Sequence, residues 1–334
     1  MSWLALTRTH LVGMLRRMRS RSALVLGLSA AIAGCAAEKG SKPPSTPTPS
    51  SASQTPQVRE MDIAVADFKL HVRIDGDPRA GVPLVAIPGG LGLSQEYLMP
   101  LARLATPTRA FVTFDPRGVG RSTRPAATPW TLADFAADTE AVRVAMGADK
   151  IHLAGHSYSG LLAMEYAIEH GDHLASLVLV DSIPPTGAAM GAAYKRYLAR
   201  QQSLAAQGLV PAELPKYEKS DCREATLAWA PVWFADPRSP RARDFPGMTC
   251  VDVDADLNIH KWDLTSALAA LSVPTIVVEP EASPFGIEMS DAGAQALSHA
   301  RLKKVVLPAC GHFPWLECEE PFFSAVRAFL DGAQ

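Results

Sequence analysis

Short apolar runs alternate with amphipathic stretches along most of the chain, and this alternation limits the possible fold more than any other feature. Two alternating runs, Met61–Val65 and Phe68–Ile74, are typical of an antiparallel hairpin. The short apolar runs expected as buried parallel strands are Leu84–Ile87, Ala110–Phe114, Ile151–Ala154, Leu177–Val180, Thr275–Val278 and Lys304–Leu307. The helices expected between them are Leu132–Ala145, Ser159–Glu169, Asp291–His299 and Pro321–Leu330. The pattern predicts an α/β fold with a mostly parallel central sheet that helices flank on both faces.

One long segment, residues 183–265, interrupts the alternation. It carries eight prolines and helical stretches such as Ala192–Ala205. A long insertion between two core strands is more often functional than decorative. Because ligands of parallel sheets bind at the carboxyl ends of the strands, we predict that residues 183–265 form a cap over that edge.

The start of the chain has the pattern of a secretory signal peptide. Residues 1–34 hold five arginines and no acidic residue, and four of the arginines precede the uncharged run Ala23–Ala33. This run is too short to cross a bilayer as a helix, whereas the order of basic, apolar and small residues is typical of an export signal. The run ends in Ile32-Ala33-Gly34-Cys35, which resembles the lipobox of bacterial lipoproteins. That resemblance implies lipidation of Cys35 and anchoring to a bacterial membrane, at the periplasmic face or the cell surface. By the same resemblance, the non-acidic Ala36 favours the outer membrane.

The next segment, residues 35–57, is rich in Pro, Ser and Thr and shows no apolar period. Such a composition cannot bury enough apolar surface to offset the entropy of ordering the chain. We therefore predict a disordered tether over residues 35–57 and a globular domain over residues 58–334.

Composition and motif content narrow the classes of partner and cofactor. The net charge is -2 and aromatic residues make up 7% of the chain, so neither a basic surface nor a base-stacking surface for nucleic acid is expected. The sequence contains no dinucleotide-binding loop and no run with metal-ligand spacing. No nucleic-acid partner, no cofactor and no metal are therefore predicted.

Cysteine usage agrees with export. Four cysteines follow Cys35, and an even number in an oxidising compartment favours disulfide bonds. Four cysteines allow three pairings, which sequence alone cannot separate. We favour Cys222–Cys250 and Cys310–Cys318 because each pair lies within one segment; four free buried thiols are the alternative.

The run Gly155-His156-Ser157-Tyr158-Ser159-Gly160 follows an expected strand and opens an expected helix. A small-x-Ser-x-small turn in that context is typical of a nucleophile elbow, which presents the serine hydroxyl at the top of the sheet. Here the chain resembles the α/β-hydrolase superfamily, over nearly all of residues 60–331. The elbow is similar to the GHSYGG form of its esterases, with Ser159 in place of the second glycine. The resemblance implies an α/β-hydrolase fold with a cap insertion and Ser157 as nucleophile.

Two upstream loops carry the same resemblance. Pro88-Gly89-Gly90-Leu91-Gly92 resembles the HGGPG loop of proline iminopeptidase-like members. It implies that the backbone N–H groups of Gly90 and Tyr158 form the oxyanion hole. The loop from Asp115 to Ser122 resembles the superfamily's DxRGxGxS loop, and we interpret it as architectural.

The general base is expected after the last core strand. Gly311-His312-Phe313-Pro314-Trp315 stands there and resembles the superfamily's GHFPWLE motif, which implies His312 as the base. The acid is open, because Ser283 stands where the superfamily usually has Asp. Asp181, at the position that dehalogenase-like members use, and Glu281 are the two candidates; Glu279 is a further alternative.

These features together predict an exported, lipid-anchored serine hydrolase that acts on a small-molecule ester or a short peptide. Ser157 would attack the carbonyl, His312 would move the proton, and water would release the acyl group. A carboxylate nucleophile, as in dehalogenases, is disfavoured because Ser157 stands at the elbow. The alternatives are a proline iminopeptidase-like aminopeptidase and a non-catalytic ligand-binding lipoprotein of the same fold.

Overall fold

The structure, a computed structural model, describes residues 57–333 except 91, 213–221, 245–247 and 252–261. The predicted signal peptide, the lipidation site Cys35 and the tether up to residue 56 lie outside the described residues. Among the helices that the structure describes, none has the length and apolar character needed to cross a membrane.

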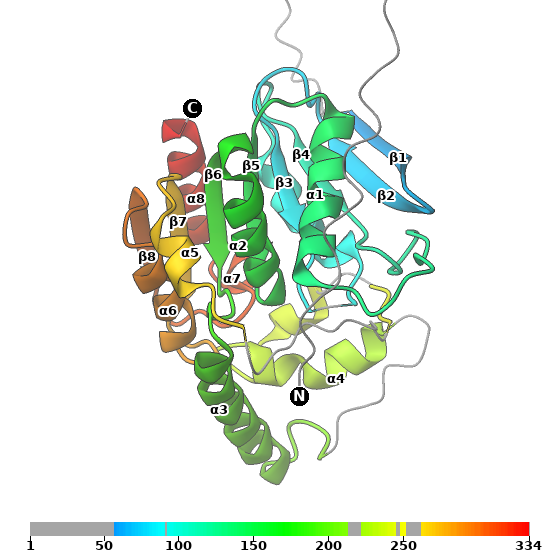
Figure 1. The fold of residues 1–334 in the computed structure, drawn as a ribbon. Coiled ribbons are helices and arrows are strands. Elements are labelled where there is room, and N and C mark those ends of the chain that lie inside the picture. The colour runs from blue at the N-terminus through cyan, green and yellow to red at the C-terminus, as the bar shows by residue number, and fades with distance from the viewer. Residues whose placement is uncertain (1–56, 91, 213–221, 245–247, 252–261, 334) are drawn as a thin grey trace, which may run out of the picture. The chain divides into compact units, whose positions relative to one another are not determined.

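An eight-stranded sheet forms the centre of the fold, with the strand order β1-β2-β4-β3-β5-β6-β7-β8 (Figure 1). β1 pairs with β2 and β2 with β4 in antiparallel fashion, and every other neighbouring pair is parallel. The strands are β1 (Val58–Val65), β2 (Phe68–Asp75), β3 (Leu84–Ile87), β4 (Phe111–Phe114), β5 (Ile151–His156), β6 (Leu174–Val180), β7 (Thr275–Pro280) and β8 (Leu302–Leu307). The predicted hairpin and the mostly parallel sheet are confirmed.

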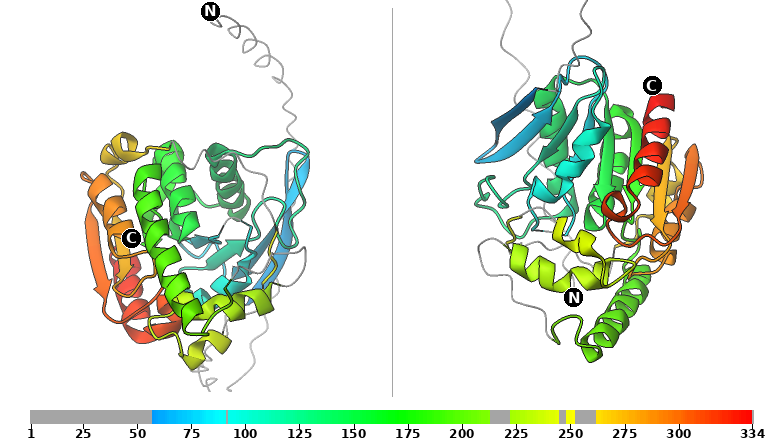
Figure 2. Two further views of the ribbon diagram at one scale, coloured as in Figure 1. Left: turned by 90° about the horizontal axis from the view of Figure 1, so that it is seen from below. Right: turned by 180° about the vertical axis from the view of Figure 1, so that it is seen from behind.

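Helices cover both faces of the sheet (Figures 1 and 2). α1 and α2 pack on one face, and the 3-10 helix η1 and α8 pack on the other. The helices outside the cap are η1 (Gln95–Leu104), α1 (Leu132–Met146), α2 (Tyr158–His170), η2 (Gly171–His173), α5 (Thr265–Ala269), α6 (Glu288–Ala296), α7 (Pro314–Glu317) and α8 (Glu319–Gly332). α1 begins at a capping box between Thr131 and Asp134 and ends at Gly147, which has a left-handed φ of +65°.

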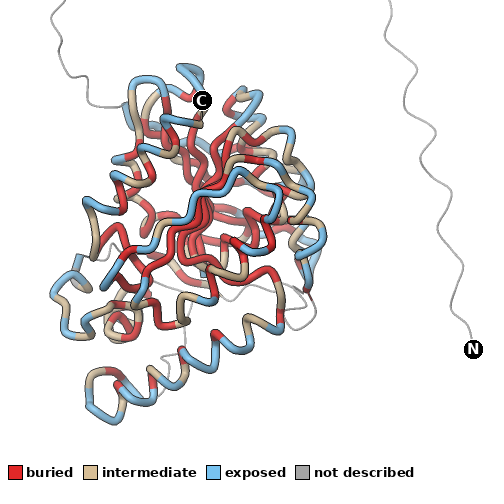
Figure 3. The backbone as a smooth tube through the Cα atoms, turned by 90° about the vertical axis from the view of Figure 1, so that its left-hand side faces the viewer, coloured by how far each residue is buried: buried red, intermediate tan, exposed pale blue. Residues whose placement is uncertain are grey.

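Successive residues of β6 alternate between two apolar cores. Leu177 and Leu179 belong to the core on the α1 and α2 side, whereas Val178 and Val180 belong to the core on the η1 and α8 side. A strand buried on both faces requires apolar side chains in both directions. Figure 3 accordingly shows the strands at the middle of the fold as its most deeply buried part.

Some predicted bounds need correction, and each correction has a local cause. β6 begins at Leu174 rather than Leu177, because Ser176 is buried and its hydroxyl lies 2.7 Å from Nδ1 of His152 in β5. Polar residues that satisfy each other inside a sheet do not show in an apolar pattern. The helix predicted over Asp291–His299 is α6, Glu288–Ala296, because Leu297 has already left the helical region with ψ of +47°.

The segment 183–265 supplies further elements at the carboxyl edge of the parallel strands (Figure 1). They are α3 (Gly187–Ala206), α4 (Arg223–Trp233) and η3 (Pro240–Asp244). α3 is thus longer than the predicted Ala192–Ala205. Tyr197 and Leu204 of α3 pack with Trp229 of α4 in a small apolar cluster of their own. The domain limits at residues 58, 183 and 265 stay predictions.

Candidate active site

Ser157 stands at a strained turn between β5 and α2. Its φ is +57° and its ψ is -123°, a combination that few residues with a side chain adopt. The small neighbours have a steric reason: a Cβ on Gly155 would lie 2.4 Å from the carbonyl oxygen of Ser159, and a Cβ on Gly160 would lie 1.9 Å from Oγ of Ser182. The elbow therefore needs glycine on both sides of the turn, and the local sequence provides it.

Ser159 occupies the position where the GHSYGG form has glycine, and the structure gives it a specific task. The residue is fully buried, and its Oγ accepts a hydrogen bond of 2.9 Å from the N–H of His156. The same oxygen lies 2.7 Å from the carbonyl of Ile87 and 2.9 Å from that of His156, so its proton bonds to one of them. The departure from glycine ties the elbow to the end of β3.

Asp181 and His312 come together from distant parts of the chain. Nδ1 of His312 lies 2.6 Å from Oδ2 of Asp181, and both side chains are almost completely buried. Asp181 follows β6 with a φ of +39°, and its N–H donates to the carbonyl of Val278 in β7 at 3.0 Å. This geometry orients the imidazole by its Nδ1 and leaves Nε2 for the nucleophile.

Of the acid candidates, the structure brings only Asp181 to His312. Glu281 is exposed, and its nearest hydrogen-bonding partner is the N–H of Ala309 at 3.4 Å. Glu279 is buried but lies 2.9 Å from Nζ of Lys304, and burial raises the pKa of its carboxyl group to about 7. The contact with His312 favours Asp181 as the acid, whereas Glu279 and Glu281 make the contacts described here with Lys304 and with the N–H of Ala309.

Two serines support the acid, and sequence reasoning missed this role. Ser283 Oγ donates a hydrogen bond of 2.8 Å to Oδ2 of Asp181, and Ser290 Oγ donates one of 3.5 Å to Oδ1. Ser283 stands where the superfamily usually has Asp, so that position still serves the acid, here through a hydroxyl group. The sequence signal that could have pointed to this role is the serine at position 283, where the superfamily usually has Asp.

A buried relay connects the oxyanion loop to the loop of the base. Gly89 N–H donates to Oη of Tyr97, whose Oη lies 3.3 Å from Nδ1 of His156, and Nε2 of His156 lies 2.8 Å from the carbonyl oxygen of His312. Burial, together with the neighbouring His312, holds the pKa of His156 well below its usual value. A neutral His156 therefore donates through Nε2 and accepts from Tyr97 through Nδ1. His156 therefore positions the two loops relative to each other.

The predicted oxyanion donors border the same cavity as Ser157 and His312. Gly90 has a φ of +55°, and Tyr158 is the first residue of α2, whose first N–H groups have no partner within the helix. The cavity measures about 360 Å³. Its lining is mostly apolar and comes from the core (Leu93, Tyr97, Phe285, Phe313) and from the segment 183–265 (Ile183, Met190, Tyr194, Tyr197, Trp233, Met248, Val251).

Both disulfides lie next to this cavity, in the pairing that the sequence favoured. Cys222 bonds to Cys250, and Cys310 bonds to Cys318. The second bond closes the segment that holds His312. The first fixes α4 to a segment that pairs with the oxyanion loop, where the N–H of residue 251 donates to the carbonyl of Gly92 at 3.0 Å.

The cap also contacts the loop of the base directly. The N–H of His312 donates to the carbonyl of Trp233 at 2.7 Å. Glu317 accepts from the N–H of Gly311 at 2.7 Å and from the N–H of Ala235 at 2.9 Å. These bonds make the position of the base depend on the end of α4.

The loop from Asp115 to Ser122 has the architectural contacts expected of it. Asp115 is buried and accepts hydrogen bonds from the N–H groups of Gln95, at 2.9 Å, and Arg121, at 2.8 Å. Arg117 bonds to Asp138 of α1 through two contacts of 2.8 Å. The loop thus joins η1 and α1 to the sheet and does not reach the cavity.

Comparisons with known proteins agree with this architecture. A family model described as alpha/beta hydrolase fold matches residues 82–220. "Putative carbamate hydrolase RutD" of Caulobacter vibrioides is 38% identical over 124 residues, which are 37% of this chain and 46% of that protein. The chain thus spans about half the length of this curated relative. The proline iminopeptidase of Thermoplasma volcanium is 23% identical over 270 residues, which are 74% of this chain and 88% of that protein.

Solved structures resemble the fold over most of the chain. The proline iminopeptidase of Mycobacterium smegmatis is 21% identical with a TM-score of 0.60, and the match covers 82% of this chain and 98% of that one. A proline iminopeptidase-related protein from Thermus thermophilus is also 21% identical, with a TM-score of 0.65 and coverage of 83% and 100%. At these identities the likeness concerns the fold, and the predicted fold class is confirmed.

Proposed function

The chain belongs to the α/β-hydrolase superfamily, and from that premise we propose that it is a serine hydrolase that cleaves an ester or amide bond. One observation carries the proposal: Asp181 lies 2.6 Å from Nδ1 of His312, and His312 borders the same cavity as Ser157 at the elbow. An imidazole that a buried carboxylate orients beside a serine at an elbow is the arrangement that acyl transfer requires.

In the proposed reaction, Ser157 attacks the substrate carbonyl while His312 takes its proton. Asp181 holds the imidazole in the tautomer that accepts at Nε2 and stabilises the imidazolium that forms. The N–H groups of Gly90 and Tyr158 bind the developing oxyanion; losing one such donor costs about 3–4 kcal/mol of barrier. His312 then protonates the leaving group, and water releases the acyl group from Ser157.

The cavity favours an ester with an uncharged acyl group. The described residues that line it include no carboxylate, so within that part of the chain no group pairs with a protonated amine. The matches to proline iminopeptidases over 74% and 79% of the chain favour the second candidate, an aminopeptidase that acts on an N-terminal proline. The two candidates differ in the scissile bond, an ester or an amide, and in the charge next to the scissile carbonyl.

We also propose that the enzyme acts at a membrane surface through a lipid on Cys35. The support is the basic and apolar sequence before the cysteine and the Pro- and Ser-rich segment after it. Growth of a bacterial host with a labelled fatty acid should label the full chain and place it in the membrane fraction. Cys35→Ser should lose both properties and keep its hydrolase activity; a labelled Cys35→Ser variant would refute the assignment.

Fluorophosphonate labelling tests the proposed nucleophile. The oxidised, folded protein should label at Ser157, and Ser157→Ala should not label. Ser203→Ala, at an exposed serine of α3, is the matched control and should label like the wild type. A folded wild-type protein that does not label would favour the non-catalytic, ligand-binding alternative.

A substrate comparison separates the two candidate reactions. Short acyl esters and N-terminal proline amides are turned over side by side under the same conditions. We expect a higher kcat/KM for the esters. Preferential cleavage of the proline amides would assign the aminopeptidase activity instead.

A further inference from the structure

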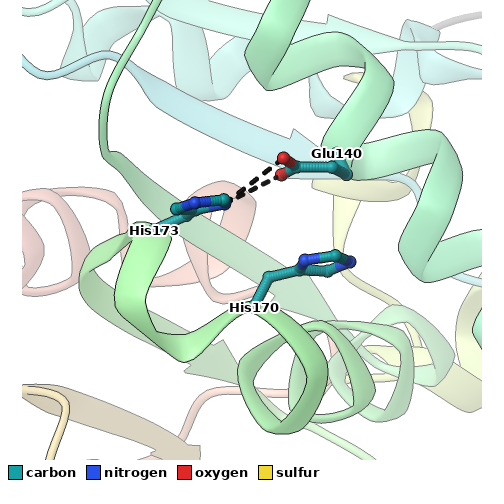
Figure 4. A group of neighbouring side chains, drawn as sticks. All are labelled: Glu140, His170 and His173. Atoms are coloured by element: carbon teal, nitrogen blue, oxygen red, sulfur yellow. Dashed lines mark hydrogen bonds and ion pairs between the residues drawn. The ribbon is translucent and has the colours of Figure 1, made fainter. Parts of the chain in front are cut away.

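Three potential metal ligands meet at the end of α2 that lies farthest from the nucleophile (Figure 4). Glu140 comes from α1, His170 is the last residue of α2, and His173 is the last residue of η2. One ligand atom from each lies within 4.8 Å of the others. Because α2 has 13 residues, each of which rises about 1.5 Å, roughly 20 Å separate this cluster from the elbow at Ser157.

The side chains converge with little rearrangement needed. Nδ1 of His173 lies 3.2 Å from Oε1 of Glu140, and the rings of His170 and His173 are nearly parallel, with centroids 6.0 Å apart. A zinc ion sits about 2.0–2.2 Å from nitrogen and oxygen ligands, so its ligand atoms are about 3–4 Å from one another. Rotation of the partly exposed imidazoles can supply the remaining approach.

The carboxylate of Glu140 is held ready to act as a ligand. Arg143 donates to both carboxylate oxygens, at 2.9 and 2.6 Å, and Tyr166 Oη donates to Oε2 at 2.8 Å. Oε1 therefore keeps one lone pair that can face His173. The hydrogen bonds from Arg143 and Tyr166 fix the orientation of the Glu140 carboxylate, as hydrogen bonds to metal-bound carboxylates do.

The charges around the site favour the binding of a cation with moderate affinity. The C-terminus of α2 carries partial negative charge where His170 ends it. Glu169 adds a carboxylate 3.9 Å from Nε2 of His170. The positive charge of Arg143 opposes these terms, and the site is open enough to water for a solvent molecule to complete the coordination.

We propose that Glu140, His170 and His173 bind a divalent transition-metal ion with a preference for zinc. Two imidazoles and one carboxylate form a ligand set that suits zinc, whereas calcium and magnesium prefer oxygen ligands throughout. The ion would join α1 to the turn between α2 and β6. Its distance from Ser157 assigns it a structural role.

Titration of the full chain with zinc chloride tests the site. The protein, its disulfides intact, is first treated with a chelator and dialysed. Calorimetry should then show one zinc bound to these residues, and magnesium should give no heat. His173→Gln and His170→Gln should each weaken zinc binding by about tenfold or more. His299→Gln, at an exposed histidine outside the cluster, is the matched control and should bind like the wild type.

Two further measurements make the outcome decisive. Zinc should raise the thermal midpoint of the wild type and of the His299 variant but not that of the His170 and His173 variants. Circular dichroism spectra should be equal in all four proteins, which shows that they are folded and keeps this test separate from the catalytic proposal. The proposal is overturned if the wild type does not bind zinc, or if the His170 and His173 variants bind it as tightly as the wild type.

Discussion

Replacement of Ser159 by glycine tests whether the stability of the elbow depends on agreement with the GHSYGG form or on the hydrogen bonds of Ser159. The change restores the GHSYGG form, so a pattern argument expects a neutral or favourable result. The structure predicts the opposite, because Ser159 is fully buried and its Oγ is bonded to the N–H of His156 and placed beside the carbonyl of Ile87. Ser159→Ala removes the same oxygen and keeps the Cβ.

The expected cost follows from the bonds that disappear. The N–H of His156 loses the hydroxyl oxygen as an acceptor, and a carbonyl loses the hydroxyl donor; each such bond contributes about 0.5–1.5 kcal/mol. We therefore expect both variants to lose about 1–3 kcal/mol of unfolding free energy. For a chain of this size that corresponds to a fall of about 2–12 °C in the thermal midpoint.

Thermal unfolding by circular dichroism and urea titration measure this effect. The urea midpoint should fall with an unchanged slope, which indicates a change in stability rather than in the compactness of the unfolded state. Fluorophosphonate labelling at Ser157 reports whether the turn is still formed. If Ser159→Ala and Ser159→Gly both unfold within about 0.5 kcal/mol of the wild type, the hydrogen bonds at Ser159 do not hold the elbow and the reasoning fails.

Three further predictions follow from other contacts. Asp181→Asn should lower kcat by about 10⁴, whereas Glu281→Gln, at an exposed side chain, should leave kcat near the wild-type value, as steady-state kinetics would show. Loss of the Cys310–Cys318 bond should cost about 2–3 kcal/mol of unfolding free energy and lower turnover, because the bond closes the segment around His312; denaturation and activity of a Cys310→Ser, Cys318→Ser double variant, which keeps Cys222–Cys250, measure both. Glu279 has a folded pKa raised to about 7, so its contribution to stability is greatest at low pH and is lost as the pH rises through 7. Wild-type stability should therefore fall by about 1–3 kcal/mol between pH 5 and 8, and Glu279→Gln should remove that fall; a Gln variant with the same pH profile would contradict the assignment.

The fold was predictable where burial alone decides the residue type. β3, β4 and β7 are buried on both faces, and the runs that predicted them differ from the observed strands by at most two residues. The beginning of β6 was not predictable, because Ser176 is polar and is satisfied by His152 of the neighbouring strand. The beginning of β8 was not predictable for another reason: its first residues are exposed at the edge of the sheet and include two lysines, so no apolar pattern marks them. A sequence pattern does not show polar partners on neighbouring strands, such as Ser176 and His152.

The residues of the candidate site also differ in how directly the sequence predicts them. Ser157 and His312 each stand in a local motif that a turn geometry requires, so the sequence points to them directly. The acid has no such motif, because a carboxylate needs only to reach Nδ1 of the base. Which of Asp181 and Glu281 does so depends on how β6, β7 and the loop after β8 pack, and the structure decides that by the 2.6 Å contact.

Backbone strain at two neighbouring strand ends argues that side-chain chemistry determines the residues there. Ser157 and Asp181 both have positive φ, at +57° and +39°, where glycine would be least strained. Such positions cost of order 1–3 kcal/mol each and persist only where the surroundings hold them. Here the N–H of Ser157 donates to Val180 at 3.1 Å, the N–H of Ile183 donates to the carbonyl of Ser157 at 3.0 Å, and the N–H of Asp181 donates to β7. Ala66 and Ala309 also have positive φ, so strain by itself does not mark a reactive group. At these two strand ends, however, the side chains are a hydroxyl that borders the cavity and a carboxylate that contacts His312, which agrees with the roles proposed for Ser157 and Asp181.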